Sequence, residues 1–162
     1  MARPLDSAGL QAYLSARIAP ARALGLEVEG IEPVIIAAPL EANLNDKGTG
    51  FAGSLFSVAA LAGWAHVMRW CAAQSFEAEV MLQASKAQFL APARGRFHAT
   101  ALEPSRAQQE KLARMLARGG RGRIEVAVTV SCEEATVMTL AAVYAVIVSA
   151  RSQADAPQGG LR

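Results

Sequence analysis

Residues 50–70 read GFAGSLFSVAALAGWAHVMRW, and apolar or small residues lie on every side of this stretch until Arg69. As a helix with a rise of about 1.5 Å per residue, the stretch would be roughly 30 Å long. A helix that is apolar on all sides is either buried in the centre of a domain or crosses a membrane. Gly63 would let a sheet approach closely, whereas Ser57 and His66 disfavour transfer into lipid. We therefore predict a buried central helix and no membrane association.

The rest of the chain is large enough to enclose this helix in one domain. It has 162 residues, of which 52% are hydrophobic and 19% charged, so it can bury a full core and is not disordered. We expect one domain over residues 1–150 and a flexible C-terminal tail over 151–162, where all periodicity is lost. Two distant cysteines and the lack of a signal-peptide pattern indicate a cytoplasmic protein. The excess of Arg over Lys is typical of a GC-rich bacterial genome.

Segments with strand periodicity flank the predicted central helix. β-Branched residues and alternation predict one interrupted strand before it, at residues 24–38, and four strands after it, at 77–92, 95–102, 122–133 and 136–148. We expect residues 95–102 to be the hairpin partner of 77–92. Amphipathic helices are predicted at 5–18 and 105–118. Strands that follow one another without crossover helices favour an antiparallel sheet curled around the central helix, an α+β fold.

The start of the central helix is the main candidate for a ligand site. Gly48–Gly53 spells GxGxxG, but no strand leads directly into it and the following strands are not parallel, so a dinucleotide fold is not favoured. The first N–H groups of a helix lack partners within the helix and attract an anion or a polarised carbonyl oxygen. We therefore expect the unpaired N–H groups at the start of this helix to be the donors of such a site.

The loop before this helix carries the densest group of polar side chains beside the apolar helix, namely Asn43, Asn45, Asp46 and Lys47. Carboxylate, amide and ammonium groups beside free backbone donors are suited to acid–base chemistry on a carbonyl compound. The alternative is that Asn45 and Asp46 only form a turn and cap the helix, which these residue types commonly do.

Asn45–Leu55 (NDKGTGFAGSL), together with Gly63-Trp64 and Phe89-Leu90-Ala91-Pro92, resembles the putative thioesterase domain of the YiiD C-terminal type. The resemblance covers residues 5–150. It implies a hotdog fold, in which an antiparallel sheet wraps around one long central helix, and a homodimer, with a tetramer left open. It also implies a thioesterase whose substrates are acyl thioesters of coenzyme A or of acyl carrier protein.

Phenylacetate-type hotdog thioesterases share part of this pattern, which Asn45, Gly48 and Gly53 match. The chain departs from it at Phe51, where that subgroup has a histidine, and at Ala60, where it has the catalytic aspartate. Its acid–base groups therefore cannot be transferred to this chain. Either Asp46 or Asn45 positions the water, or the pocket binds thioesters without hydrolysing them.

The predicted mechanism is attack of water on a thioester whose carbonyl oxygen is held at the helix start. Catalytic roles are expected for Asn45, Asp46, Ala52 and Gly53. Substrate binding is expected for Lys47, Gly48, Thr49, Gly50, Phe51, Ser54 and Leu55. The rival hypothesis is a catalytically silent module that binds acyl ligands. A covalent route through Ser54 or Ser57 is disfavoured, because no histidine or lysine is placed to activate either one.

Other functions receive less support from the sequence. A hydratase would need a histidine paired with a carboxylate near the helix, and neither His66 nor His98 fits. The sequence contains no metal-ligand spacing, and we expect no cofactor apart from coenzyme A as part of the substrate. Residues 91–123 hold eight basic side chains against two glutamates. We expect Arg118–Arg123 to end a helix and lead into a strand, and to meet phosphates rather than nucleic acid.

Overall fold

The computed structural model describes residues 6–149; the predicted tail at 151–162 lies outside them. Helices and strands follow one another along the chain as α1 (Ser7–Arg17), α2 (Ala19–Ala23), β1 (Glu27–Ile31), β2 (Val34–Ala38), a 3-10 turn (Glu41–Asn43), α3 (Ala52–Ala73), β3 (Ala78–Phe89), β4 (Phe97–Ala101), α4 (Arg106–Gly119), β5 (Arg121–Cys132) and β6 (Ala135–Val148). In the described part of the chain no helix is long and apolar enough to cross a membrane.

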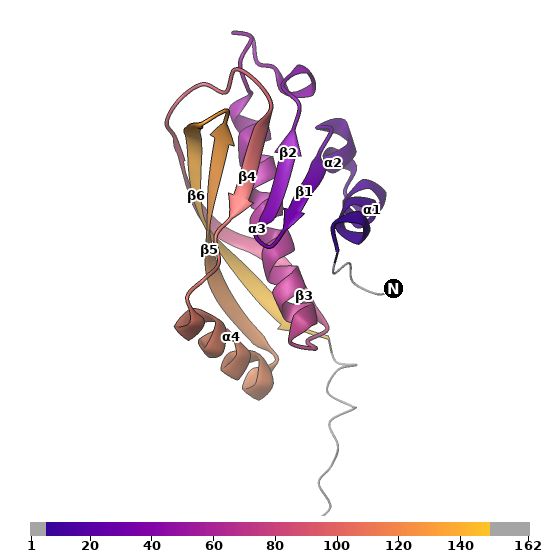
Figure 1. The fold of residues 1–162 in the computed structure, drawn as a ribbon. Helices are drawn as coiled ribbons and strands as arrows, with labels where there is room; N and C mark the ends of the chain where they lie inside the picture. The colour runs from indigo at the N-terminus through magenta and orange to yellow at the C-terminus, as the bar shows by residue number, and fades with distance from the viewer. Residues whose placement is uncertain (1–5, 150–162) are drawn as a thin grey trace, which may run out of the picture.

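The six strands form one antiparallel sheet in the order β1-β2-β4-β5-β6-β3. The sheet curves around α3, which lies along its concave face (Figure 1). The inward side chains of β5 alternate with exposed ones, so that Ile124, Val126, Val128 and Val130 are buried against the helix. The predicted α+β architecture, an antiparallel sheet around one long helix, is confirmed.

The closest packing of α3 on the sheet occurs at Gly63. A Cβ atom at this position would lie 2.4 Å from the hydroxyl oxygen of Tyr144 on β6, so only glycine fits without a shift. The Tyr144 hydroxyl donates to the carbonyl oxygen of Ala60 in α3, at 2.7 Å. Burial raises the pKa of Tyr144, so the phenol stays a neutral donor. This contact fixes the position of α3 along the sheet.

The first half of the chain departs from the predicted elements in detail. The strand expected over 24–38 is a hairpin, in which β1 pairs with β2 and the register shifts between Val28 and Gly30. Helix α1 ends at Arg17, within the predicted range 5–18, and Pro20 then occupies the first turn of a separate helix, α2, that was not predicted. Proline is tolerated there because the N–H that it lacks would have no partner within the helix.

The predicted hairpin between residues 77–92 and 95–102 is wrong. β3 pairs along its length with β6, and β4 lies between β2 and β5. The connection between β3 and β4 instead reaches the start of α3, where the N–H of Gly50 donates to the carbonyl oxygen of Ala93 at 2.8 Å. The alternation of residues along a strand indicates its length but not the strand with which it pairs. In the sheet that curves around α3, β5 and β6 lie between the consecutive strands β3 and β4.

We expect Gly63→Ala to destabilise the protein by about 1–3 kcal/mol, because the added methyl group must displace the Tyr144 ring from a packed core. The free energy of unfolding from urea denaturation measures this. The matched control is Gly119→Ala in α4, where a Cβ atom would meet nothing within 4 Å. Equal stability of the two variants would contradict the proposed close packing.

Candidate active site at the start of the central helix

Helix α3 begins with two backbone donors that have no partner. Its N-cap residue, Phe51, forms no side-chain cap, and the N–H groups of Ser54 and Leu55 both donate to the Phe51 carbonyl oxygen, at 3.0 and 3.1 Å. Neither the N–H of Ala52 nor that of Gly53 has a hydrogen-bond partner among residues 6–149. Two free donors at the positive end of a 22-residue helix form a site for an oxygen that carries negative charge.

The ring of Phe51 lies against these donors. A Cβ atom on Gly53 would be 2.4 Å from Cε1 of Phe51, so the ring covers the α-carbon of the glycine. The ring itself is 54% exposed. The helix start is therefore walled by an aromatic face on one side and remains open on another.

Asn45 closes the loop that leads into the helix. Its Oδ1 accepts from the N–H groups of Lys47 and Thr49, at 2.9 and 3.0 Å, and its Nδ2 donates to the hydroxyl oxygen of Thr49 at 2.9 Å. The same Nδ2 approaches the carbonyl oxygen of Gly50 at 3.4 Å. These contacts use the hydrogen-bonding capacity of the side chain, so Asn45 positions the loop.

A second asparagine, Asn43, joins the loop to the rest of the domain. The residue is 2% exposed, and its side-chain Nδ2 donates to the backbone carbonyl oxygens of Leu24 and Pro39. Its backbone carbonyl oxygen accepts from the N–H of Phe51 at 2.7 Å. Asn43 therefore holds the residue from which α3 starts. Asn43 belongs to the polar group identified in the sequence, but no catalytic or structural role was predicted for it.

An open groove of about 340 Å³ runs beside the helix start. Loop and helix residues form one side and the end of β3 with the following residues forms the other; the lining residues are Asn45, Thr49, Gly50, Ala52, Leu55, Phe89, Leu90, Ala91 and Pro92. Two of the lining side chains, Phe89 and Leu90, are large, apolar and more than half exposed, as are Leu44 and Phe51 in the loop that leads into α3. The groove therefore combines free polar donors with an apolar rim.

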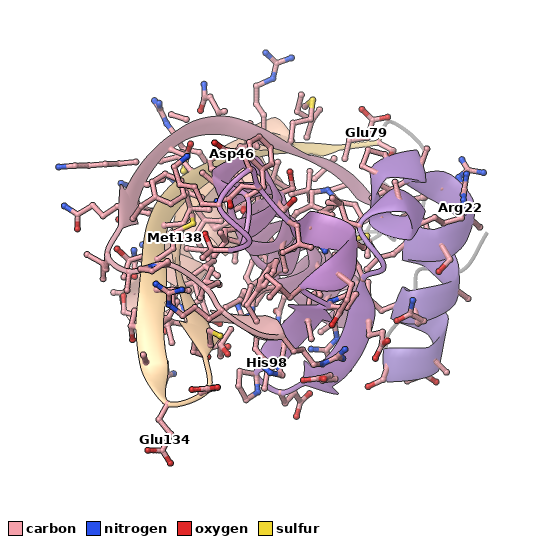
Figure 2. The ribbon with its side chains drawn as sticks, turned by 90° about the horizontal axis from the view of Figure 1, so that it is seen from above. Arg22, Asp46, Glu79, His98, Glu134 and Met138 are labelled. Atoms are coloured by element: carbon pink, nitrogen blue, oxygen red, sulfur yellow. The ribbon has the colours of Figure 1, made fainter. Side chains whose placement is uncertain are left out.

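The acidic candidate Asp46 lies outside this lining. Its carboxylate pairs with the ammonium group of Lys47 at 2.9 Å, and both side chains are more than 70% exposed. Figure 2, seen from above, shows Asp46 over the end of the central helix and His98 at the periphery. Exposed pairs of this kind are held weakly, so the Asp46 carboxylate can exchange its partner.

The family model described as putative thioesterase (yiiD_Cterm) matches residues 7–148. The chain belongs to this family. No curated protein sequence matches the chain. At a general level, this family is one of thioester hydrolases. The match confirms the resemblance to this family that the sequence showed.

Solved structures show the fold of this thioesterase family member. A Chlorobaculum tepidum protein of unknown function has a TM-score of 0.82 at 25% identity, covering 88% of this chain and 94% of its own. A Shewanella oneidensis protein described as a putative thioesterase has a TM-score of 0.78 at 20% identity, covering 88% and 97%. A probable thioesterase of Pseudomonas aeruginosa has a TM-score of 0.76 at 23% identity, covering 92% and 100%. The fold is the hotdog fold.

The structure brings only part of the predicted site together. Among the predicted residues, Asn45, Thr49, Gly50, Ala52 and Leu55 line the groove. The predicted residues Lys47 and Gly48 are exposed on the turn, where Gly48 has a φ of 72°. Ser54 is buried, and the Ser57 hydroxyl donates to the Gly53 carbonyl oxygen at 2.8 Å.

Residues 89–92 were not among the predicted site residues, although they line the groove. They lie about 40 positions further along the chain than the loop, and only the fold brings them beside it. The signal that could have found them is Phe89-Leu90-Ala91-Pro92, an apolar segment that ends at a proline and leaves a strand.

Each histidine lies near a carboxylate, although no such arrangement was predicted from the sequence. His98 Nδ1 lies 2.7 Å from Glu29, which also accepts from Arg96 at 2.7 Å on the outer side of the sheet. Partial burial would raise the pKa of Glu29, but the hydrogen bonds from Arg96 and His98 outweigh it and lower the pKa. His66 lies 3.6 Å from Glu103, in a different part of the molecule from the helix start. Neither pair contributes to the groove.

The arginine-rich segment adopts the predicted structure. Gly120 caps α4 with a φ of 66°, and β5 begins at Arg121. Arg121 and Arg123 are exposed, line an open groove of about 290 Å³ with Ile147, and have no ion-pair partner within residues 6–149. Across the same part of the chain, no group of three or more His, Cys, Asp or Glu side chains is arranged to hold a metal ion.

We expect Asn45→Ala to lower the free energy of unfolding by about 1–3 kcal/mol, because the amides of Lys47 and Thr49 lose their acceptor. Their hydrogen exchange should accelerate relative to wild type. The matched control is Asp46→Asn on the same turn, where only an exposed pair is lost and the change should be below about 1 kcal/mol. Slow exchange at Thr49 in Asn45→Ala would contradict the positioning role.

Proposed function

We propose that the chain hydrolyses acyl thioesters of coenzyme A in the groove at the start of α3. The observation that carries this proposal is the pair of free N–H groups of Ala52 and Gly53 beside a groove with an apolar rim. A thioester carbonyl oxygen that accepts from both groups would place its carbon next to the groove. The acyl chain would then lie against the exposed side chains of Phe51, Phe89 and Leu90.

In the proposed step, water attacks the carbonyl carbon and its proton passes to a carboxylate. The negative charge that develops on the carbonyl oxygen is stabilised by the two amides, and one such donor is worth about 3 kcal/mol in the transition state. The tetrahedral intermediate then collapses, the carbon–sulfur bond breaks, and the thiolate takes up a proton. The products are a carboxylic acid and free coenzyme A.

Asp46 is the proposed general base. An amide such as Asn45 is not a base, and its hydrogen bonds already serve the turn, which favours Asp46 of the two candidates. The Asp46 carboxylate would leave Lys47 and accept the proton of the attacking water. The rest of the predicted substrate-binding set, including Lys47, Gly48 and Thr49, would shape the mouth of the site.

The proposed assembly is a homodimer formed through β3. This strand is an edge of the sheet, and six consecutive residues, 81–86, are exposed on both of its faces. Met81 and Leu82 are 43% and 39% exposed. An open edge strand with apolar side chains favours pairing with another strand, and a second copy of β3 would extend the sheet and border the groove at Phe89.

In the proposed homodimer, coenzyme A is favoured over a carrier protein by two arginines on β5. Within one chain they lie at the opposite end of the sheet from Phe89, and antiparallel pairing of the two β3 strands would bring the arginines of one subunit toward the groove of the other. Arg121 and Arg123 have no acidic partner in the described chain, and the groove between them and Ile147 has an apolar wall. Phosphates pair well with guanidinium groups, and an adenine ring packs on apolar side chains.

The alternative is a module that binds acyl ligands without hydrolysing them. Two observations favour it: Phe51 covers one side of the helix start, and Asp46 lies outside the groove lining.

Turnover separates these two functions. A panel of short, medium and aromatic acyl-CoAs should be hydrolysed by the wild-type chain, and Asp46→Asn should lower kcat by about 10²–10⁴-fold with little change in stability. Thiol release followed with a disulfide reagent measures the rate. Binding without turnover would establish the silent module, and an unchanged kcat in Asp46→Asn would remove this residue from the mechanism.

The arginines can be tested independently of the chemistry. In the double variant Arg121→Ala/Arg123→Ala, KM for acyl-CoA should rise by at least about tenfold, while KM for the same acyl group on N-acetylcysteamine, which lacks phosphates, should not change. The control is Arg106→Ala, because that arginine pairs with Glu110 on α4. Equal effects on both substrates, or preferential loss of acyl carrier protein turnover, would contradict phosphate recognition at β5.

A further inference from the structure

A second cavity, of about 420 Å³, lies away from the start of α3. It is bordered by the turn between β1 and β2, by the second half of α3 and by Glu103, which precedes α4. Its lining includes Glu32, His66, Arg69, Trp70 and Glu103. Its volume is in the range of ligand sites, about 300–1,000 Å³, and apolar walls with a few polar groups are typical of such sites. The proposed thioester chemistry uses none of these residues.

The notable group in this cavity is the imidazole of His66. The residue is only 8% exposed, and its Nε2 atom has no hydrogen-bond partner. Oε2 of Glu103 lies 3.6 Å from it, which is too far for a hydrogen bond. A buried polar atom without a partner is costly, so a ligand that supplies one would be stabilised.

Neighbouring side chains orient the Glu103 carboxylate. The other oxygen of Glu103 accepts from Nε2 of Gln109 at 2.7 Å, and Trp70 Nε1 donates to Oε1 of the same Gln109 at 2.9 Å. α4 is thereby tied to α3 on one side of His66. Because the Glu103 side chain is 67% exposed, little packing opposes the small shift that would let a group enter between the carboxylate and the imidazole.

The charges in the cavity favour a cation. Arg69 donates to the carbonyl oxygen of Ile31 and to Glu32, the latter at 3.2 Å, so these two opposite charges compensate each other. Glu103 then leaves one net negative charge among the lining residues. The indole of Trp70 adds an aromatic surface, which attracts cations and packs against apolar groups.

We propose that this cavity binds a small primary ammonium compound with an apolar body, whose ammonium group donates to both His66 Nε2 and the Glu103 carboxylate. An ammonium group has three donors and no acceptor, so it satisfies both atoms at once, whereas an alcohol brings no charge and a carboxylate is repelled by Glu103. The apolar body would lie against Trp70 and Pro33.

Binding should depend on pH in a defined direction. Burial lowers the pKa of His66 from its ordinary value of 6.5; Glu103 opposes this shift and Arg69 adds to it. The imidazole is therefore neutral at pH 7.5. Below its pKa the protonated ring would pair with Glu103 and repel the ammonium group. Besides Glu103 and Arg69, the charged residue that lines the cavity is Glu32 on the β1–β2 turn; the α4 residue that contacts Glu103 is the uncharged Gln109, which is not among the lining residues.

The test uses the full chain and 2-phenylethylamine, with 2-phenylethanol and 3-phenylpropionate as neutral and anionic probes of similar shape. Calorimetry at pH 7.5 should show binding of the amine and at least about tenfold weaker binding of the other two. The histidine ring signals in NMR spectra should shift for His66 and not for His98, which serves as an internal control on the outer side of the sheet.

Glu103→Gln keeps the shape of the side chain and should weaken binding of the amine by at least about tenfold, since a hydrogen bond to a charged group is lost. Glu110→Gln, on the exposed side of α4, is the matched control and should leave the affinity unchanged. The proposal is overturned if the amine does not bind, if phenylethanol binds as well, if Glu103→Gln binds normally, or if affinity increases as the pH is lowered. None of these outcomes depends on thioester turnover.

Discussion

The enclosure of α3 by the sheet is the constraint on which the other features depend. A helix with apolar residues on all sides must be covered along its length, and the curved antiparallel sheet does this from β2 round to β3. Coverage of the sides does not extend to the helix start. The curved sheet leaves the first N–H groups of α3 uncovered. The burial that stabilises the apolar helix therefore also leaves two unpaired donors at its start.

Close packing then determines where these donors lie. The contact of Gly63 with Tyr144, together with the hydrogen bond from the Tyr144 hydroxyl to Ala60, sets the position of α3 relative to β6. At the start of the helix, Asn43 and Asn45 hold the loop from within and Gly50 donates to Ala93 beyond β3. The donors, the loop and the end of β3 are thus held beside one groove.

Much of the fold could be predicted because its main signal is local. The apolar residues of 50–70 indicate a buried helix, and alternation in residues 122–133 and 136–148 indicates strands that cover it. The pairing of strands could not be predicted in the same way: β3 and β4 are consecutive in the chain but belong to distant parts of the sheet. Pro20 shows a similar limit, since a proline can begin a helix as well as end one.

The candidate site was predictable in its backbone and less so in its side chains. Helix geometry indicated donors at the helix start and the resemblance to hotdog thioesterases pointed to Ala52; the N–H groups of Ala52 and Gly53 are both free in the described structure. The asparagines of the loop could not be ranked, because a hydrogen-bonded turn and a water-binding group use the same residue type. Contacts between distant residues, such as His66 with Glu103 or the loop with Phe89–Pro92, depend on tertiary structure, and the local sequence does not show that the two members meet.

The most direct test of the central claim is the kcat for acyl-CoA hydrolysis by Ala52→Pro. Proline is well accommodated at the first position of a helix, and Phe51 before it already has the extended backbone that a following proline requires, so the substitution removes one N–H donor while the helix remains. Ala52→Gly, which keeps the donor, is the control. If the Ala52 N–H stabilises the transition state, kcat falls by about 10²–10³-fold in Ala52→Pro and stays near the wild-type value in Ala52→Gly. An unchanged kcat in a folded Ala52→Pro variant would contradict it.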